Sequence, residues 1–491
     1  MEPKWKLVES SNGSAAIENA RSNGHNNAEH EPPPLEHNMN GPDNSVISEV
    51  SSAKPENQDR TPSLGPVPVV DSYSAELKSY ARVTSSSHFQ DVRLMDLRLE
   101  SPYTYGPGAV AVVYPKNFPA DVDEFVKLMH WEDMADVSLD AVPTSPASDG
   151  KILSPSPLKH LDVSRVKLTL RWLLENVLDI MSIPRRSFFS NLAYFAGTKT
   201  EDEQYQKERL LELANPELID ELWDYTTRPK RTILEVMMDF TTIQIPWPYA
   251  LSLIPIMRGR QFSIASGGAR TQDGEGRTNV ELLVAIADPP SPIIKYRRRY
   301  GVCTRYIATL QPGQRINIGM QQGYLGVQPD EIEVPVIMIG PGTGVAPMRS
   351  MIHQRQVWAE EWASTLAGKH PAQDILFFGC RSEDDDYFFR DEWAELSTQS
   401  GFKVIPAFSR DKNRPKQYVQ DQIKANAAAV FEALHTHGGK VYVCGSSGNM
   451  PKGVREALLD VLVEQGTMSR VDAEAYLDGM EKSGRYKQET W

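Results

Sequence analysis

Residues 336–350 read VIMIGPGTGVAPMRS, an apolar strand that runs into a glycine-rich turn and then directly into a helix. Glycines let a backbone approach a ligand closely, and a helix N-terminus offers unpaired N–H groups and the positive end of the helix dipole. The glycines alone would also fit a tight turn without a ligand, but such a turn does not explain Thr343 and Pro347. The stretch therefore predicts a phosphate-binding turn built from Gly340, Gly342, Thr343 and Gly344.

Strands and helices alternate from this turn to the end of the chain. The apolar segments VPVIMIG, DILFFGC, FKVIPAF and KVYVCG are each followed by a helical pattern. Such alternation is typical of an open parallel sheet covered by helices. We therefore expect a doubly wound, Rossmann-like domain over residues 329–491.

The chain before this sheet contains short, turn-bounded strand patterns. They are ARVTSSSHFQDVRLMDLRLE, AVAVVYP, QFSIAS, NVELLVAIAD, RYIATL and QRINIGM. Their spacing predicts a small antiparallel barrel over residues 72–328. A helical insertion is expected at about 140–240, including a buried helix over residues 166–180. The predicted fold class is α/β plus a β-barrel.

Composition limits the other possibilities. Residues 1–71 are rich in Ser, Asn, Pro and Glu, so we expect a disordered tail or linker there. A net charge of −13 disfavours nonspecific binding to nucleic acid. The three cysteines form no CxxC or Cys/His cluster, so no metal site is expected. No apolar stretch approaches the roughly 20 residues of a spanning helix, and a cytoplasmic protein is expected.

A basic loop, AFSRDKNRPKQYVQ at residues 407–420, follows another predicted strand. Ser409, Arg410, Lys416 and Tyr418 could surround a dianionic 2′-phosphate, with Arg410 also able to stack on an adenine. Taken alone, these residues fit a solvated basic loop better. Because ligands bind at the carboxyl ends of strands in doubly wound sheets, the position favours the 2′-phosphate of NADPH.

Two further motifs suit a flavin. In RGRQFSIAS, residues 258–266, Arg260 could neutralise a pyrophosphate, Phe262 could stack on the isoalloxazine and Ser263 could bond near its N5. Strand alternation puts Arg260 and Phe262 on one side and Ser263 on the other. An ordinary barrel strand fits the same letters. YGVCT, residues 300–304, suits a second phosphate site, and a simply capped helix explains it equally well.

The order of these motifs resembles the ferredoxin–NADP reductase superfamily. RxFS, GVCT, GPGTGVAP, FFGCR, SRDxxxxxKxYVQ, VYVCG and a terminal aromatic occur in that sequence. Within it, the chain is similar to the diflavin reductases, which include cytochrome P450 reductase and the sulfite reductase flavoprotein. FSIAS, CGSSGNMPK and RTILEVMMDF are most similar to the NADPH-dependent diflavin oxidoreductases. The resemblance covers about residues 72–491.

The resemblance implies roles for particular residues. The FAD contacts would be Lys230 (or Arg231), Arg260, Gln261, Phe262, Ser263, Gly301, Val302, Cys303 and Thr304. The NADPH contacts would be Thr343, Arg381, Ser409, Arg410, Lys416, Gln417, Tyr418, Val419 and Gln420. The hydride path would be lined by Ser263, Cys444, Glu489 and Trp491, with Glu489 standing where an aspartate is familiar. Without the resemblance, Cys444 is simply a buried strand cysteine.

The resemblance also implies an activity. A hydride would pass from NADPH to FAD, and electrons would continue to an FMN domain and an anamorsin-like iron–sulfur protein in cytosolic cluster assembly. Residues 1–71 could not form an FMN domain, so FMN is expected only if such a domain, missing here, exists. The alternatives are an electron donor of the P450-reductase or sulfite-reductase type and a nucleotide-binding regulatory protein without turnover.

Overall fold

The computed structural model describes residues 4–10, 60–144, 155–288, 299–365, 371–400, 402–412 and 414–491. The chain forms two compact units. Unit 1 consists of Met1–Pro62 and Lys116–Met257, and unit 2 consists of Ser63–Pro115 and Arg258–Trp491. The predicted domain boundaries at residues 71 and 328 stay predictions.

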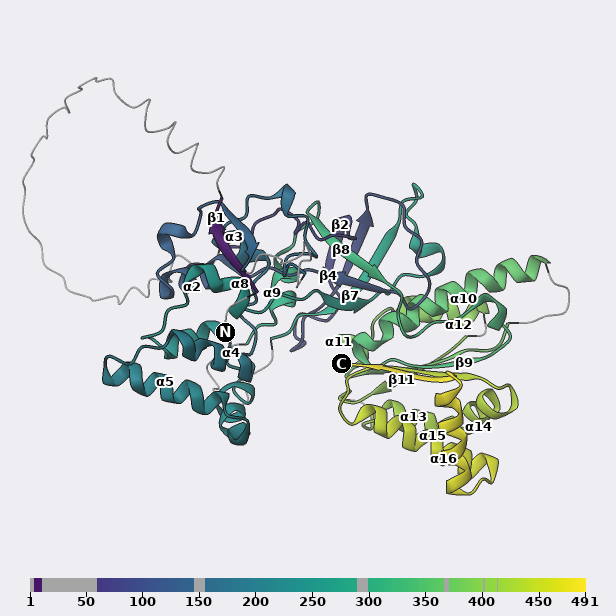
Figure 1. The fold of residues 1–491 in the computed structure, drawn as a ribbon. Helices are drawn as coiled ribbons and strands as arrows, with labels where there is room; N and C mark the ends of the chain where they lie inside the picture. The colour runs from purple at the N-terminus through teal and green to yellow at the C-terminus, as the bar shows by residue number, and fades with distance from the viewer. Residues whose placement is uncertain are drawn as a thin grey trace, which may run out of the picture. The chain divides into compact units, whose positions relative to one another are not determined.

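Unit 1 is mainly helical (Figure 1). Its single described sheet pairs β1 (Trp5–Glu9) with β5 (Leu139–Pro143) in antiparallel register. Its helices are α2 (Pro119–Leu128), α3 (Leu170–Asn176), α4 (Arg186–Leu192), α5 (Glu201–Ala214), α6 (Ile219–Leu222), α7 (Ile233–Asp239) and α8 (Ala250–Leu253). Capping boxes at Thr200 and Thr232 fix the starts of α5 and α7, because each threonine and the glutamate three residues on satisfy each other's backbone N–H groups.

Two predictions for unit 1 are wrong in part. The expected tail over residues 1–71 contains strand β1, held by its pairing with β5 and by the buried side chain of Leu7; residues 11–59 lie outside the described residues. The helix expected over 166–180 is limited to α3. The Thr169 hydroxyl accepts a hydrogen bond from Trp172 N and starts the helix late, and Leu178 bridges to Ile256 after the helix has ended.

The first half of unit 2 is the expected antiparallel barrel. Its strands are β2 (Tyr73–Arg82), β3 (Val92–Leu99), β4 (Val110–Val113), β6 (Arg260–Ser263), β7 (Asn279–Ala285) and β8 (Arg315–Gln321). They form one sheet in the order β6-β4-β8-β2-β3-β7. An antiparallel bridge between Ile264 and Leu282 joins the two edge strands, so the barrel is nearly closed.

One strand prediction within the barrel is wrong. Residues 305–310, RYIATL, belong to helix α9 (Val302–Thr309) rather than to a strand. Cys303, Tyr306 and Ile307 are all buried in the barrel core. Their spacing of three and four residues is that of one helix face, and this packing outweighs the strand propensity of the segment.

The second half of unit 2 is the expected parallel sheet. Its strands are β9 (Val336–Ile339), β10 (Ile375–Cys380), β11 (Lys403–Phe408), β12 (Lys440–Gly445) and β13 (Tyr486–Thr490). Their order is β11-β10-β9-β12-β13. The chain adds β10 and β11 on one side of β9 and then crosses to add β12 and β13 on the other side, so the strand order switches between β9 and β12. Ligands of such sheets bind at this switch point, outside the carboxyl ends of the strands. The sequence pattern predicts no strand at β13, which forms by parallel pairing with β12.

Helices cover both faces of this sheet, as Figure 1 shows. One face carries α10 (Val345–Thr365), the short α11 (Glu383–Asp386) and α12 (Arg390–Ser400). The other carries α13 (Val419–Ala425), α14 (Ala427–Phe431), α15 (Met450–Gly466) and α16 (Arg470–Lys482). Each face has its own apolar core. The doubly wound prediction is therefore confirmed.

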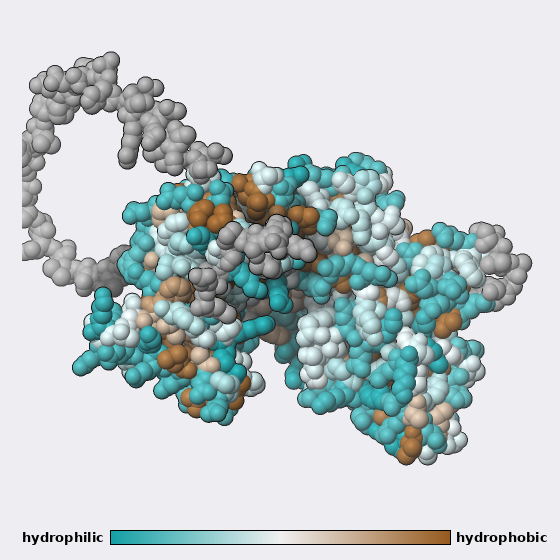
Figure 2. Space-filling view, in the orientation of Figure 1, coloured by the Kyte–Doolittle hydropathy of each residue, from teal (hydrophilic) through white to brown (hydrophobic). Residues whose placement is uncertain are grey.

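The surface is mainly hydrophilic, with apolar side chains gathered over the helices of unit 1 (Figure 2). Leu211, Leu218, Ile219 and Trp223 are among the exposed large residues there. Among the helices in the described ranges, none combines the length and the apolar character needed to cross a bilayer.

Candidate functional site

A cavity of about 510 Å³ lies in unit 2 where the barrel meets the parallel sheet. The barrel contributes strand β6 and parts of β4 and β7, and the sheet contributes the glycine-rich turn and the end of β13. The lining residues are Val110, Arg260, Gln261, Phe262, Ser263, Leu283, Ala285, Thr343, Ala346, Glu489, Thr490 and Trp491. This one cavity is therefore lined by residues of the predicted flavin motif, of the glycine-rich turn and of the chain terminus.

Strand β6 is held in place by β4. The two strands pair in antiparallel register, with Ser263 opposite Val110 and Phe262 opposite Ala111. Alternation predicted that Ser263 would face away from Arg260 and Phe262, yet all three line the cavity. Ser263 is the last residue of β6, so the cavity reaches around the end of the strand.

The N-terminus of α9 lies close to β6. Gly301 is the N-cap, and no side chain caps the helix. A Cβ at Gly301 would lie 2.8 Å from Thr304 Oγ1, and that hydroxyl already accepts a hydrogen bond from Ala287 N at 3.0 Å. Burial raises the pKa of Cys303 to about 12, against an opposing effect of the Arg260 charge. The N–H groups at the α9 N-terminus and the Arg260 guanidinium on β6 are each suited to an anion.

Two glycines of the turn after β9, Gly342 and Gly344, have different structural roles. Gly342 has a φ of 58°, and no atom lies within 4 Å of a Cβ built there, so the turn is open to a ligand. A Cβ at Gly344 would lie only 2.1 Å from Cys444 O, so this glycine lets the turn pack against the end of β12. Thr343, between them, lines the cavity.

A cluster of cations follows β10 and β11. Arg410 N donates to Arg381 O at 2.8 Å, and Ser409 N donates to Cys380 O at 3.0 Å, which ties the two strand ends together. The Lys416 ammonium lies 4.9 Å from the centre of the Tyr418 ring, and the nearby Lys416 and Arg410 lower the pKa of the Tyr418 phenol. The Arg381 guanidinium lies 4.4 Å above the Phe89 ring, from the β2–β3 hairpin. The structure thus brings these predicted NADPH residues together.

Other predicted residues lie elsewhere. Val419 is buried in the core at the start of α13, and the Gln417 side chain accepts from Gln422 Nε2 at 2.9 Å. Gln420 packs beside Gly453. Lys230 is exposed in unit 1 at a φ of 52°, and its neighbour Arg231 is paired with Asp239. Their proposed cofactor contacts stay predictions.

The end of the chain completes the cavity wall. Cys444 on β12 pairs in register with Glu489 on β13, and burial raises the pKa of both side chains. Glu489 Oε2 is buried without a hydrogen-bond partner among the described residues. Trp491 is 58% exposed, and its backbone is fixed by bonds to Gly445 O and from Ser447 N.

These features fit FAD and NADPH. The α9 N-terminus and Arg260 suit a pyrophosphate, Phe262 offers a ring for stacking, and the open turn at Gly342 suits a second pyrophosphate. The buried, unpartnered Glu489 Oε2 lies on a residue of the cavity wall, where a bound ring system could supply its missing partner.

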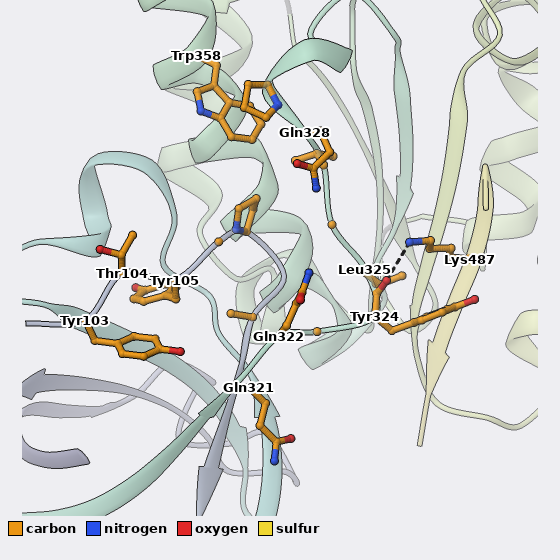
Figure 3. Close-up of a pocket in the computed structure, with 17 residues that line it drawn as sticks. Tyr103, Thr104, Tyr105, Gln321, Gln322, Tyr324, Leu325, Gln328, Trp358 and Lys487 are labelled. Atoms are coloured by element: carbon orange, nitrogen blue, oxygen red, sulfur yellow. Dashed lines mark hydrogen bonds between the residues drawn. The ribbon is translucent and has the colours of Figure 1, made fainter. Parts of the chain in front are cut away.

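A second cavity, of about 560 Å³, lies beside the loop that joins β8 to β9 (Figure 3). Tyr103, Tyr105, Tyr324 and Trp358 give it aromatic walls. Its single lining lysine, Lys487, donates to Tyr324 O at 3.1 Å, and none of the described lining residues is an arginine. None of the residues of the predicted FAD and NADPH motifs is among its lining residues.

Several residues that line the cavity of about 510 Å³ were not predicted from the sequence. They are Val110, Leu283, Ala285, Ala346 and Thr490. Ala346 sits within the glycine-rich motif and could have been included. The others are ordinary strand residues, and only the pairing of their strands brings them to the cavity.

Comparison with known proteins agrees with this geometry. The FAD binding domain family matches residues 66–306, and the oxidoreductase NAD-binding domain family matches residues 338–456. The NADPH-dependent diflavin oxidoreductase 1 of Emericella nidulans is 46% identical over 86% of this chain and 64% of its own length. Those of Xenopus laevis and Bos taurus are 37% and 34% identical, over 85% and 87% of this chain and 64% and 66% of their own lengths.

The chain thus spans a little under two thirds of the length of these relatives. The FAD binding match covers strands β2 to β7 of the barrel together with the helical segment of unit 1 that lies between β4 and β6 in sequence, and the NAD-binding match lies within the parallel-sheet part. The chain therefore carries an FAD binding domain followed by an oxidoreductase NAD-binding domain, and over this part it is similar to the NADPH-dependent diflavin oxidoreductases.

Proposed function

We propose that this chain is an NADPH-dependent flavoprotein reductase that takes hydride from NADPH onto FAD and passes electrons to a protein acceptor. One observation carries the proposal: Phe262 and Ser263 of the flavin motif share a cavity with Thr343 of the glycine-rich turn and with Trp491. A nicotinamide held by the turn could therefore meet a flavin held by β6.

The bound cofactors supply the chemistry, a hydride transfer from nicotinamide C4 to flavin N5. The chain positions them. Arg260 and the N–H groups of residues 301–304 would hold the FAD pyrophosphate. Gly342 and Thr343 receive the NADPH pyrophosphate, and the cations after β10 and β11 bind its 2′-phosphate.

The residues around the hydride path have distinct tasks. Ser263 and Glu489 line the cavity directly, whereas Cys444 lies behind Glu489 in the adjacent strand. Because burial raises the pKa of Glu489, this carboxyl holds a proton more readily than an exposed one. Trp491 lines the same cavity, where its ring would shield a bound flavin and would have to move aside for the nicotinamide.

The electron acceptor is proposed from the family. The relatives are named as diflavin enzymes, which implies a second flavin between FAD and the final acceptor. We infer an FMN domain and then an anamorsin-like iron–sulfur protein, in cytosolic iron–sulfur cluster assembly. The exposed apolar side chains of unit 1 support a protein partner, since such patches mark interaction surfaces.

The test has two steps. Flavin released by acid from the purified chain should be FAD in near-stoichiometric amount, and NADPH should bleach the visible flavin band without oxygen. NADH should do so much more weakly. A chain that binds FAD but is not reduced by NADPH would exclude the proposed activity.

A further inference from the structure

Two arginines of helix α10 are buried, yet they serve different parts of unit 2. Arg349 is 1% exposed and Arg355 is 3% exposed. Arg355 donates to Asp374 Oδ2 at 2.7 Å and to the carbonyl oxygens of residues 331, 332 and 334. All its partners belong to the segments that enter β9 and β10, so it stabilises the parallel sheet alone.

Arg349 instead joins the sheet to the barrel. Its Nη1 donates to Glu281 Oε2 on β7 at 2.6 Å and to Ala265 O, beyond β6, at 2.9 Å. Its Nε and Nη2 donate to the two carboxylate oxygens of Glu392 on α12 at 2.7 and 3.0 Å. The guanidinium also lies 4.3 Å from the centre of the Phe389 ring.

The barrel atoms that Arg349 contacts lie at the seam where the barrel closes. Ile264 bridges to Leu282 there, and Ala265 N donates to Glu281 O at 2.8 Å. Arg349 therefore fastens both sides of the seam. Its neighbour Ser350 adds a hydrogen bond from its hydroxyl to Ser266 O at 2.7 Å.

The seam and the helix carry opposite walls of the cavity. Ala265 is two residues beyond Ser263, the last residue of β6. Arg349 lies about one helical turn after Val345, where α10 starts directly behind Thr343 and the open glycine-rich turn. Arg349 thus links strand β6, two residues before Ala265, to the glycine-rich turn, about one helical turn before the arginine.

The chemistry of the guanidinium suits this role. Burying a charge is costly unless it is fully paired, and Arg349 has two carboxylates and one carbonyl around it. Its planar fork can meet several acceptors at fixed angles, whereas a lysine is a compact charge that cannot span them together. A rigid contact of this kind fixes the distance between helix α10 and the barrel seam in addition to stabilising the fold.

We propose that Arg349 is a positioning residue that sets the separation between flavin strand β6 and the nucleotide-binding turn. The inference rests on the proposed function. Hydride transfer depends steeply on the approach of the reacting rings, and a misplacement of about 1 Å can cost on the order of 100-fold in rate. Binding of the nucleotide's adenosine end, at β10 and β11, does not depend on this separation.

The test compares Arg349→Met with Arg355→Met, which removes an equally buried arginine of the same helix. In Arg349→Met we expect the limiting rate of flavin reduction at saturating NADPH to fall roughly 10- to 100-fold. The dissociation constant of 2′,5′-ADP should stay within about twofold of wild type, and amide hydrogen exchange in residues 262–268 should rise. Arg355→Met should change neither the reduction rate nor that exchange.

Equal rate losses in both variants would overturn the inference, and so would unchanged exchange in residues 262–268 of Arg349→Met. Arg349→Lys, which keeps the charge but not the fork, should remain slow; full rescue would contradict the geometric argument. If Arg349→Met does not fold, Glu281→Gln removes the barrel partner with little change in shape and should slow reduction similarly. Failure of wild type to be reduced would refute the proposed function instead, while the exchange measurement would still test the contact.

Discussion

Glu392 should make the folding of unit 2 sensitive to acid. Burial disfavours its charge, but hydrogen bonds and charges from His353 and Arg349 lower the pKa of its carboxyl from 4.5 to about 2. The Arg270 guanidinium also lies 3.2 Å from the Glu392 carboxylate. The folded state therefore prefers the ionised carboxyl more strongly than the unfolded chain does. This stabilisation is complete above the unfolded pKa and is lost as the pH falls through the folded one.

The size of the effect follows from the shift. A change from 4.5 to about 2 corresponds to about 3 kcal/mol of unfolding free energy, present at neutral pH and absent near pH 1. By pH 3.5 the unfolded carboxyl is mostly protonated and the folded one is still ionised, so about 1.4 kcal/mol is lost. Glu392→Gln has no such titration. Its stability should fall less between pH 7 and pH 3.5, by about that amount.

Methionine oxidation in rising urea would measure this, because Met348 and Met351 are buried on α10 beside the network. The oxidation midpoints of these two residues report local unfolding at each pH. Asp391→Asn is the matched control, since its carboxyl is exposed one residue away on α12. A Glu392→Gln protein with the same pH dependence as wild type and as the control would refute the assigned pairing.

Three further outcomes are expected. Replacing Arg410 and Lys416 together with Ala should raise the KM for NADPH, leave NADH almost unaffected and reduce the preference for NADPH at least about tenfold, because the two proposed charge-assisted contacts with the 2′-phosphate are lost. An unchanged preference in steady-state kinetics would contradict their role. Trp491→Ala should improve NADH turnover and shift the flavin spectrum. If Trp491 only packs against neighbouring residues, its removal should leave the kinetics unchanged and cause a small loss of thermal stability, since the side chain is 58% exposed. Gly344→Ala should destabilise the protein by about 1–3 kcal/mol in urea unfolding, since its Cβ would lie 2.1 Å from Cys444 O; wild-type stability would mean that the turn can move away.

The two cofactor motifs were recognisable because each is contiguous. A strand, a glycine turn and a helix start within residues 336–350, so local propensity and local ligand chemistry coincide. The alternation after residue 333 likewise predicted the parallel sheet without any long-range information. The errors fell where packing overrides propensity. RYIATL forms part of α9 because its face fills the barrel core, and residues 486–490 form β13 because β12 offers a free edge.

The sequence alone therefore predicted the two kinds of domain and their order, and it suggested residues for each cofactor that stay predictions. Only the tertiary structure decided which of them meet. Arg260 and Phe262 come to share a cavity with Thr343 and Trp491 because the barrel and the sheet pack together. Arg349 donates to the carboxylates of Glu281 and Glu392, which lie 68 and 43 residues away in the sequence, and no sequence motif predicts these contacts. A charge can be buried at such a site only when the complete fold brings every partner to it, because a guanidinium with any partner missing would be better left in water.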